Sequence, residues 1–362
     1  MYRAEEVKVL HLEVTSRCNA ACPMCLRTVA GGEPNPQLPL VEISLDEAKT
    51  IFPTAFLAQL KRTYFCGNYG DPASAQDTLE IARYFREQNE KMDLSLFTNG
   101  GVRSPAWWKS LAGVVSSIRF GIDGLESTNH LYRRNVDWKR LMASVEAFVS
   151  AGGIADWDFI AFEHNEHEIE AARTLARELG FRRFQVKRTG RFFSNTRSTA
   201  KDSQEVLDRT GKHLYDLRPP RTPALQNQAL AKEEALRERY GNMDSYLDTT
   251  RVACKVAKEG SVYVSAEGFV FPCCWTANQM YPWYYEPRTS QIWKHMRAHD
   301  VTLESINAKR NGILEIIESP WMQSSFAKSW AQGSVREGKL KVCAKTCGAE
   351  FDPFQEQFRG AL

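Results

Sequence analysis

Three cysteines lie within eight residues near the start of the sequence. Cys18, Cys22 and Cys25 follow an apolar segment with the spacing C-x3-C-x2-C. A loop this short can supply three corners of an iron–sulfur cubane, because the chain reaches about 3.3 Å per residue. The loop offers no fourth ligand, which would leave one iron open to a small molecule. A structural zinc site normally has four protein ligands, so the alternative is a zinc knuckle closed by a distant cysteine or by His11.

The chain has nine cysteines in total, and we expect them to be reduced thiols. Their number is odd, and the first residues, MYRAEEVKVLHLEV, lack the basic, apolar and cleavage regions of a signal peptide. Both features argue against a disulfide framework and favour thiols that act as metal ligands.

The residues around the first three cysteines, SRCNAACPMC, resemble the signature of the radical S-adenosylmethionine (SAM) enzymes. The resemblance implies a [4Fe–4S] cluster on Cys18, Cys22 and Cys25, whose open iron chelates the amine and carboxylate of SAM. It also implies that one electron, from a flavodoxin- or ferredoxin-type donor, releases a 5′-deoxyadenosyl radical that abstracts hydrogen from a substrate C–H bond. Met24 stands where the family commonly has an aromatic residue, and its polarizable thioether can cover an adenine face.

The resemblance implies further positions that bind SAM: Met24, Gly70, Asp71, Thr98, Asn99, Asp123, Arg134 and Asn165. Most follow apolar segments in motifs similar to those of the family: Gly70-Asp71-Pro72, Thr98-Asn99-Gly100, and Asp123-Gly124 followed by Arg133-Arg134. In these motifs the acidic residue after Gly70 would meet the ammonium of SAM, although Asp71 could instead cap the next helix. Either Arg133 or Arg134 could pair with the methionine carboxylate.

A second group of cysteines occupies the last third of the chain: Cys254, Cys273, Cys343 and Cys347. The first two flank Gly268 in the pattern C-x13-G-x4-C, which resembles the SPASM and shorter "twitch" extensions of radical SAM enzymes. This resemblance implies one auxiliary [4Fe–4S] cluster on the four thiols, although zinc fits the same spacing. Cys274 points away from its neighbour in extended chain, so we expect Cys274 and Cys66 to be packed thiols.

Short apolar segments alternate with amphipathic ones over the first half of the chain. The expected strands are residues 7–14, 62–66, 94–98, 117–122, 157–162 and 183–187. Ser44 and Glu47 form a capping box between the first two, and Asp137 opens a helix that ends at Gly152. Six alternations predict an α/β fold with a parallel sheet and crossover helices. The family resemblance specifies a partial (β/α)6 TIM-like barrel, with the chemistry at the carboxyl ends of the strands.

The pattern changes after about residue 190. We expect three parts: the barrel at 1–197, a polar helical linker at 198–250, and a twitch-like auxiliary iron–sulfur domain at 251–362. RPPRTP at 218–223 is a plausible hinge. SVYVSAEGFVFPCCW predicts a small β-hairpin that turns at Ala266–Gly268. An aromatic-rich loop follows it, with Trp283, Tyr284 and Tyr285 as core or as a substrate wall.

Composition excludes several classes of protein. The 47 Lys and Arg nearly balance the 44 Asp and Glu, for a formal charge of +3, so nothing indicates binding to nucleic acid or to an acidic membrane. No segment approaches the roughly 18 apolar residues that span a bilayer. A hydrophobic fraction of 43% with 25% charged residues fits a folded cytoplasmic protein.

The sequence therefore favours a radical SAM oxidoreductase or peptide-modifying enzyme. A peptide or amino-acid-type substrate is the first expectation, because the aromatic module could accept an extended chain. Against it, only six residues precede the first strand, which leaves no room for an N-terminal leader-recognition domain. The alternatives are dehydrogenation or epimerisation of a small metabolite such as a sugar or aminocyclitol, and, from another class, a non-catalytic zinc-binding interaction protein.

Overall fold

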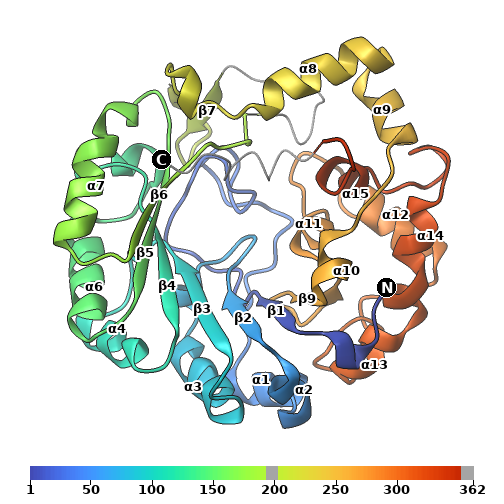
Figure 1. Ribbon diagram of the computed structural model, residues 1–362, viewed down its shortest axis with the longest axis horizontal. Helices are drawn as coiled ribbons and strands as arrows, with labels where there is room; N and C mark the ends of the chain where they lie inside the picture. The colour runs from blue at the N-terminus through green and yellow to red at the C-terminus, as the bar shows by residue number, and fades with distance from the viewer. Residues whose placement is uncertain (193–202, 352–362) are drawn as a thin grey trace.

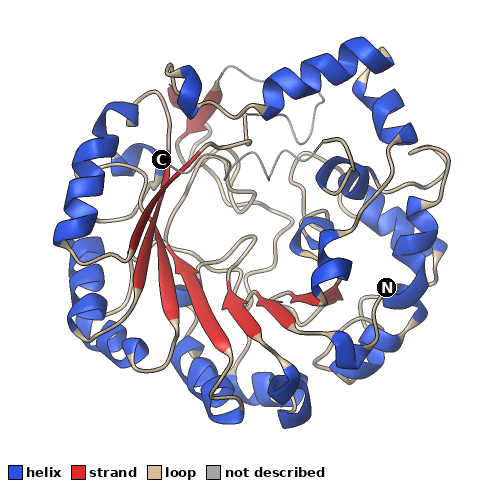
Figure 2. Cartoon of the chain, viewed as in Figure 1, coloured by secondary structure: helices blue, strands red, loops and turns tan. Residues whose placement is uncertain are grey.

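A single curved sheet of eight strands organises the protein, which we describe from a computed structural model over residues 1–192 and 203–351 (Figures 1 and 2). The strand order is β10-β9-β1-β2-β3-β4-β5-β6, and every neighbouring pair is parallel except β9 and β10. The strands are β1 (Val9–Leu12), β2 (Arg62–Phe65), β3 (Asp93–Thr98), β4 (Ser117–Gly121), β5 (Ala155–Ile160), β6 (Arg183–Lys187), β9 (Ser261–Val264) and β10 (Val270–Phe271). The six expected strands of the barrel are thereby confirmed.

Helices in the connections cover the outer face of this sheet (Figure 2). They are α1 (Leu45–Ile51), α2 (Thr54–Gln59), α3 (Thr78–Gln88), α4 (Pro105–Ala112), α5 (Asn129–Tyr132), α6 (Trp138–Ser150) and α7 (Ile169–Glu178). The capping box holds the start of α1, since the Ser44 hydroxyl accepts from Glu47 N at 3.2 Å and the Glu47 carboxylate accepts from Ser44 N at 2.9 Å. Asp137 caps α6, which buries Leu141, Val145 and Phe148 against the sheet.

The C-terminal part extends the barrel sheet. β9 pairs with β1 in parallel from Val9 opposite Ser261 to Leu12 opposite Val264, and β10 returns antiparallel to β9 as the expected hairpin. The remaining helices of this part lie beside the hairpin (Figure 1). They are α10 (Lys255–Glu259), α11 (Cys274–Ala277), α12 (Gln291–Ala298), α13 (Ile313–Glu318), α14 (Phe326–Trp330) and α15 (Lys341–Thr346).

Residues 203–250 differ from the helical linker expected from the sequence. The first half is a two-stranded antiparallel hairpin of β7 (Gln204–Leu207) and β8 (His213–Leu217), and only the second half is helical, as α8 (Ala229–Tyr240) and α9 (Met243–Thr249). The expected boundary at 197/198 lies outside the described residues. Among the described helices, none has the length and hydropathy to cross a membrane.

Candidate active site

A belt of side chains crosses the inside of the barrel, with one residue from each of seven consecutive strands. Outer-facing residues such as Leu96 and Phe120 pack against helices, so the alternate residues of each strand face inward. This lumen belt runs from β9 to β6 as Tyr263, His11, Tyr64, Phe97, Arg119, Asp158 and Lys187.

Each member of the lumen belt contacts the next. The His11 ring lies 4.9 Å from Tyr263 and 4.5 Å from Tyr64, centroid to centroid. The Arg119 guanidinium lies 4.9 Å from the Phe97 ring, and its Nε lies 3.6 Å from Asp158 Oδ2. The belt therefore fills the lumen with an aromatic half and a charged half, and forms a floor beneath the loops that leave the carboxyl ends of the strands.

The cysteine loop leaves the carboxyl end of β1 and lies over this floor. Cys22 is buried, and Cys18 and Cys25 are partly exposed. The Cys18 sulfur accepts from Ala20 N at 3.3 Å and from Asn99 Nδ2 at 3.5 Å. Burial raises the pKa of the Cys18 and Cys22 thiols, so without a bound metal these thiols keep their protons.

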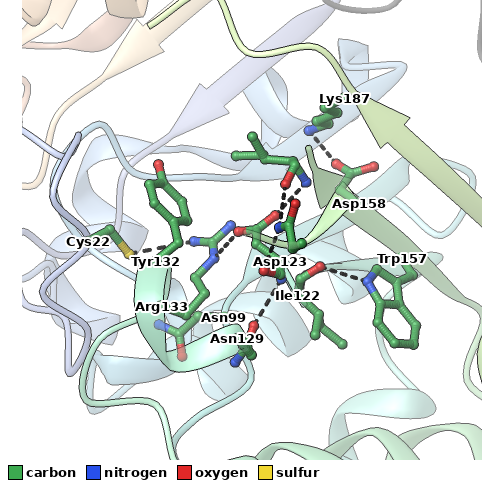
Figure 3. Close-up of polar contacts among 12 residues, drawn as sticks. Cys22, Asn99, Ile122, Asp123, Asn129, Tyr132, Arg133, Trp157, Asp158 and Lys187 are labelled. Atoms are coloured by element: carbon green, nitrogen blue, oxygen red, sulfur yellow. Dashed lines mark hydrogen bonds and ion pairs between the residues drawn. The ribbon is translucent and has the colours of Figure 1, made fainter. Parts of the chain in front are cut away.

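Arg133 provides a partly buried positive charge beside Cys22. Its Nε donates to Asp123 Oδ2 at 2.6 Å, and its Nη1 lies 3.9 Å from the Cys22 sulfur (Figure 3). Burial opposes the charged form of Arg133, but Asp123, Cys22 and Tyr132 together outweigh this effect and raise the arginine pKa. Gly121 leaves the space for the guanidinium, because a Cβ there would lie 2.3 Å from Arg133 Nη2.

Arg134, which we had expected to bind SAM, points elsewhere. Its Nη1 donates to Gly31 O at 2.7 Å and to Leu207 O, while its own carbonyl accepts from Ala21 N at 3.0 Å. These bonds tie both ends of the cysteine loop to the β7–β8 hairpin. Of the two arginines that the sequence left open, Arg133 is therefore the one beside the cysteines.

Asp71 is occupied by the protein's own donors. Its carboxylate accepts from Thr98 Oγ1 at 2.8 Å, from Asn99 N at 2.7 Å and from Ala73 N at 2.9 Å, where it caps the short 3₁₀ turn Pro72–Ser74. Asp71 therefore caps only this short turn, whereas α3 begins after Asp77. The carboxylate fixes the Thr98–Asn99 turn, and the Asn99 amide then reaches Cys18 and Asn19.

Of the remaining positions expected to bind SAM, Met24 lines a cavity, whereas Asn165 and Gly70 contact the protein's own backbone. Met24 lines a large cavity beside the cysteine loop. The side-chain amide of Asn165 is buried and hydrogen-bonded within the protein. It donates to Asp123 O at 2.9 Å and to Ile160 O at 3.0 Å, and it accepts from Phe162 N. A Cβ on Gly70 would lie 1.8 Å from Thr15 O, so the close approach at Gly70 is to the protein's own backbone.

Glu13 was missed by sequence reasoning. Its buried carboxylate accepts from Tyr69 N at 2.7 Å, from Gly70 N at 3.0 Å and from the Tyr263 hydroxyl. It therefore joins the glycine-rich loop after β2 to the C-terminal hairpin. An acidic residue inside an otherwise apolar strand, LHLEV, was the available signal.

The four auxiliary cysteines surround one small apolar cavity of about 20 Å³. An antiparallel bridge between Val252 and Gly348 brings Cys254 next to Cys347, and a hydrogen bond between these two thiols, together with burial, raises the pKa of Cys254. Cys347 N donates to Cys343 O at 2.9 Å, so the C-x3-C spacing corresponds to one turn of α15. Within the described ranges, no three His, Cys, Asp or Glu side chains converge as the ligands of one metal ion do.

A cavity of about 1180 Å³ extends from the cysteine loop to the C-terminal helices. Cys25 and Met24 lie at one end, and helices α12, α14 and α15 line the other. Cys66 and Cys274 are also among its lining residues, and burial raises the pKa of both thiols. Tyr285 is 45% exposed and Lys294 and Lys328 are exposed, so the cavity opens to solvent.

Residues 12–177 match the model of one protein family, described as the radical SAM superfamily. The chain carries a radical SAM domain. A domain of this superfamily implies a [4Fe–4S] cluster and SAM as cofactors. This agrees with the interpretation of the N-terminal cysteines.

Solved structures that include proteins bound to SAM share the fold over almost the whole chain. Streptococcus suis SuiB bound to SAM aligns with a TM-score of 0.53 and 15% identity, over 98% of this chain and 76% of SuiB. SuiB bound to its precursor peptide SuiA gives 0.55 and 13%, over 97% and 76%. The enzyme anSMEcpe with bound SAM gives 0.52 and 15%, over 97% and 92%. At these identities the likeness concerns the fold, which is the partial TIM-like barrel.

Proposed function

We propose that Cys18, Cys22 and Cys25 hold a [4Fe–4S] cluster that binds SAM, and that the enzyme modifies a peptide substrate at a C–H bond. The observation that carries the first part is the position of Arg133, a partly buried cation 3.9 Å from the Cys22 sulfur, beside three thiols of one short loop. The size and opening of the cavity carry the second part.

The residues around the three thiols suit an anionic iron–sulfur cluster. Hydrogen bonds to cluster sulfurs and nearby positive charge stabilise thiolate ligation. Ala20 N and Asn99 Nδ2 supply such donors at Cys18, and Arg133 supplies the charge at Cys22. No fourth cysteine lies in the loop, in keeping with an iron that is free to bind SAM.

When bound, the cluster and SAM together supply a 5′-deoxyadenosyl radical after transfer of one electron from a flavodoxin- or ferredoxin-type donor. The chain's own residues would then orient SAM and enclose it. Arg133 would pair with the methionine carboxylate of SAM, with Asp123 fixing its direction. Met24 would cover the adenine ring, and the lumen belt excludes water from below.

A peptide substrate is favoured over a small metabolite by the size of the cavity. Its volume of about 1180 Å³ exceeds the roughly 300–1,000 Å³ of common small-molecule sites. The exposed lining residues leave one side open, so an extended chain can enter while one residue reaches Cys25. The solved relatives with similar folds include SuiB bound to a precursor peptide, which supports this choice.

The second group of cysteines would hold an auxiliary [4Fe–4S] cluster of the SPASM or twitch kind. Cys254, Cys273, Cys343 and Cys347 meet at one cavity, and burial raises the pKa of the Cys343 thiol. Buried thiols that share a pocket are deprotonated most readily by a bound metal. Such a cluster would take up the electron from a substrate radical or bind substrate.

The decisive test is Cys22→Ala in anaerobically reconstituted enzyme. We expect 5′-deoxyadenosine formation under dithionite to fall to the background rate, because one corner of the cluster loses its ligand. Chromatographic assay of 5′-deoxyadenosine measures this. Cys66→Ala is the matched control, since that thiol lies in the same cavity outside the loop, and it should keep SAM cleavage. Cleavage by Cys22→Ala at the wild-type rate would remove this loop from the mechanism.

A further inference from the structure

The far end of the large cavity is basic. Five cations of the C-terminal helices and the segments between them line it: Lys294, Lys328, Arg336, Lys341 and Lys345. Over the described residues 289–346 that line this cavity, Glu337 is the only acidic side chain. We call this surface the basic wall. It faces the same cavity as Cys25 and Met24.

Three of these cations are exposed and uncompensated. Lys341 forms an ion pair with Asp244 at 2.8 Å, and Lys345 is partly buried and has contacts of its own. Lys294, Lys328 and Arg336, in contrast, are exposed and have no ion pair in the described ranges 1–192 and 203–351. The chain as a whole has a formal charge of only +3, so the wall concentrates positive charge that the rest of the surface balances.

An aromatic strip lines the same cavity. Trp283 and Tyr284 contact each other edge to face at 5.3 Å, and Tyr284 and Tyr285 lie 5.1 Å apart. Tyr285 O accepts from Gln37 Nε2 at 2.6 Å, so this strip is attached to the cysteine loop. Aromatic side chains of this kind give apolar contact area to an extended chain at low entropic cost.

We propose that the basic wall binds an acidic segment of the peptide substrate while a different residue of the same peptide reaches the cysteine loop. The inference rests on the proposed function and adds the chemistry of the substrate: a peptide rich in Asp or Glu on one side of the modified residue. Charge complementarity selects such a segment, because Lys- and Arg-rich peptides are repelled by the wall.

A nucleic acid is a weaker match for the same charges. Proteins that bind nucleic acid carry excess positive charge over a whole face or domain. Here the Lys and Arg residues outnumber the Asp and Glu residues by only three, and the exposed cations without an ion pair lie on one wall of a cavity. A short acidic peptide fits both the depth of the cavity and the limited extent of the charge.

The test measures binding of three fluorescein-labelled peptides of equal length, rich in Glu, Gln or Lys, to the reconstituted enzyme by anisotropy. We expect the Glu-rich peptide to bind most tightly, and high salt to weaken it. Lys294→Glu/Lys328→Glu should raise its Kd roughly tenfold or more, because two attractive pairs become repulsive. Lys109→Glu/Lys139→Glu on the outer helices makes the same change in net charge, and should leave the Kd within about twofold.

Several results would overturn the proposal: equal affinity for the three peptides, an equal loss in both double variants, or tighter binding of a single-stranded RNA oligomer than of the Glu-rich peptide. SAM cleavage under dithionite is assayed in parallel and should be unchanged in Lys294→Glu/Lys328→Glu, which also shows that the variant folds. Absence of SAM cleavage in the wild type would contradict the proposed function. The peptide-binding measurement tests separately whether the basic wall binds an acidic segment.

Discussion

Glu13 lies at the end of β1 with its carboxylate enclosed by the glycine-rich loop and by Tyr263. Burial raises its pKa from 4.5 to about 7, although the hydrogen bonds it accepts oppose the increase. In the unfolded chain this carboxyl ionises at the lower pH. Between pH 4.5 and 7 the folded protein therefore holds the additional proton, and stability falls as the pH rises.

Glu13→Gln should flatten that dependence. An amide keeps the acceptor for Tyr69 N and Gly70 N and can donate to the Tyr263 oxygen, but it has no charge to desolvate. We expect the wild type to lose about 3 kcal/mol of unfolding free energy between pH 4.5 and 7 through this group, and Glu13→Gln to avoid the loss. Urea unfolding of the apoprotein at a series of pH values measures this. Glu126→Gln, at an exposed position, is the control; parallel curves for the wild type and Glu13→Gln would contradict the prediction.

The residues of the site were only partly predictable from the sequence. Motif positions located the cysteines and the turn at Thr98–Asn99, because these depend on local spacing. The choice between Arg133 and Arg134 depends on which side chain faces Cys22 across the loop, and nothing in the neighbouring residues decides it. Glu13 and Tyr263 meet only through the pairing of β1 with β9, a contact between distant parts of the chain.

The cysteine loop is held in place by a clamp between elements. Arg134 binds the carbonyls of Gly31 and Leu207, and Leu207 N donates to Ala30 O at 3.0 Å. Ala30 and Gly31 both have positive φ, at 50° and 81°. The loop therefore has a bend that few residues adopt freely, and the β7–β8 hairpin stabilises it.

Arg134→Ala should loosen the loop without removing a cysteine. Hydrogen bonds from a charged donor contribute roughly 1.5–3 kcal/mol, so we expect amide exchange over residues 26–41 to rise about tenfold or more. Hydrogen exchange with mass spectrometry of the apoprotein measures it. Arg140→Ala on the exposed face of α6 should leave the exchange unchanged. Wild-type protection in Arg134→Ala would show that the hairpin holds the loop by other contacts.

Among the elements, the barrel strands were predictable and the β7–β8 hairpin was not. β1 and β5 are buried along their whole length, and β3 and β4 alternate buried with more exposed residues, so each gives a recognisable hydrophobic pattern. In the hairpin only Val206 and Leu217 are buried, so the hydrophobic pattern that identifies a strand is nearly absent. We infer that the contacts of Leu207 with Arg134 and with Ala30 of the cysteine loop stabilise the hairpin more than its own hydrophobic residues do.

At the level of the whole molecule, the loop after β2 contacts the first cysteine group and the residue that follows Cys273. The backbone carbonyl of Asn68 lies 4.0 Å from the Cys25 sulfur. The side-chain Nδ2 of Asn68 donates at 2.9 Å to the carbonyl of Cys274, the residue after Cys273. The two proposed clusters are thus separate in their ligands but share the loop after β2. Loss of the auxiliary cluster should therefore leave the SAM-binding loop intact.

Cys347→Ala tests this separation. We expect reconstituted enzyme to lose about four irons per chain while SAM cleavage under dithionite continues, because one ligand of a single [4Fe–4S] cluster is removed. Iron and sulfide analysis, with the visible spectrum, measures the loss. Cys274→Ala should retain all the iron, since Cys274 lines the large cavity instead. Full iron content in Cys347→Ala would exclude this thiol as a ligand.

The pairing of β1 with β9 has a consequence for synthesis of the protein. β1 leaves the ribosome about 250 residues before residues 261–264, which form one of its two neighbours. Until those residues emerge, β1 presents an unpaired backbone edge to which another nascent chain can attach. Completion of the sheet thus depends on translation reaching residues 261–264, and products truncated before them are expected to aggregate.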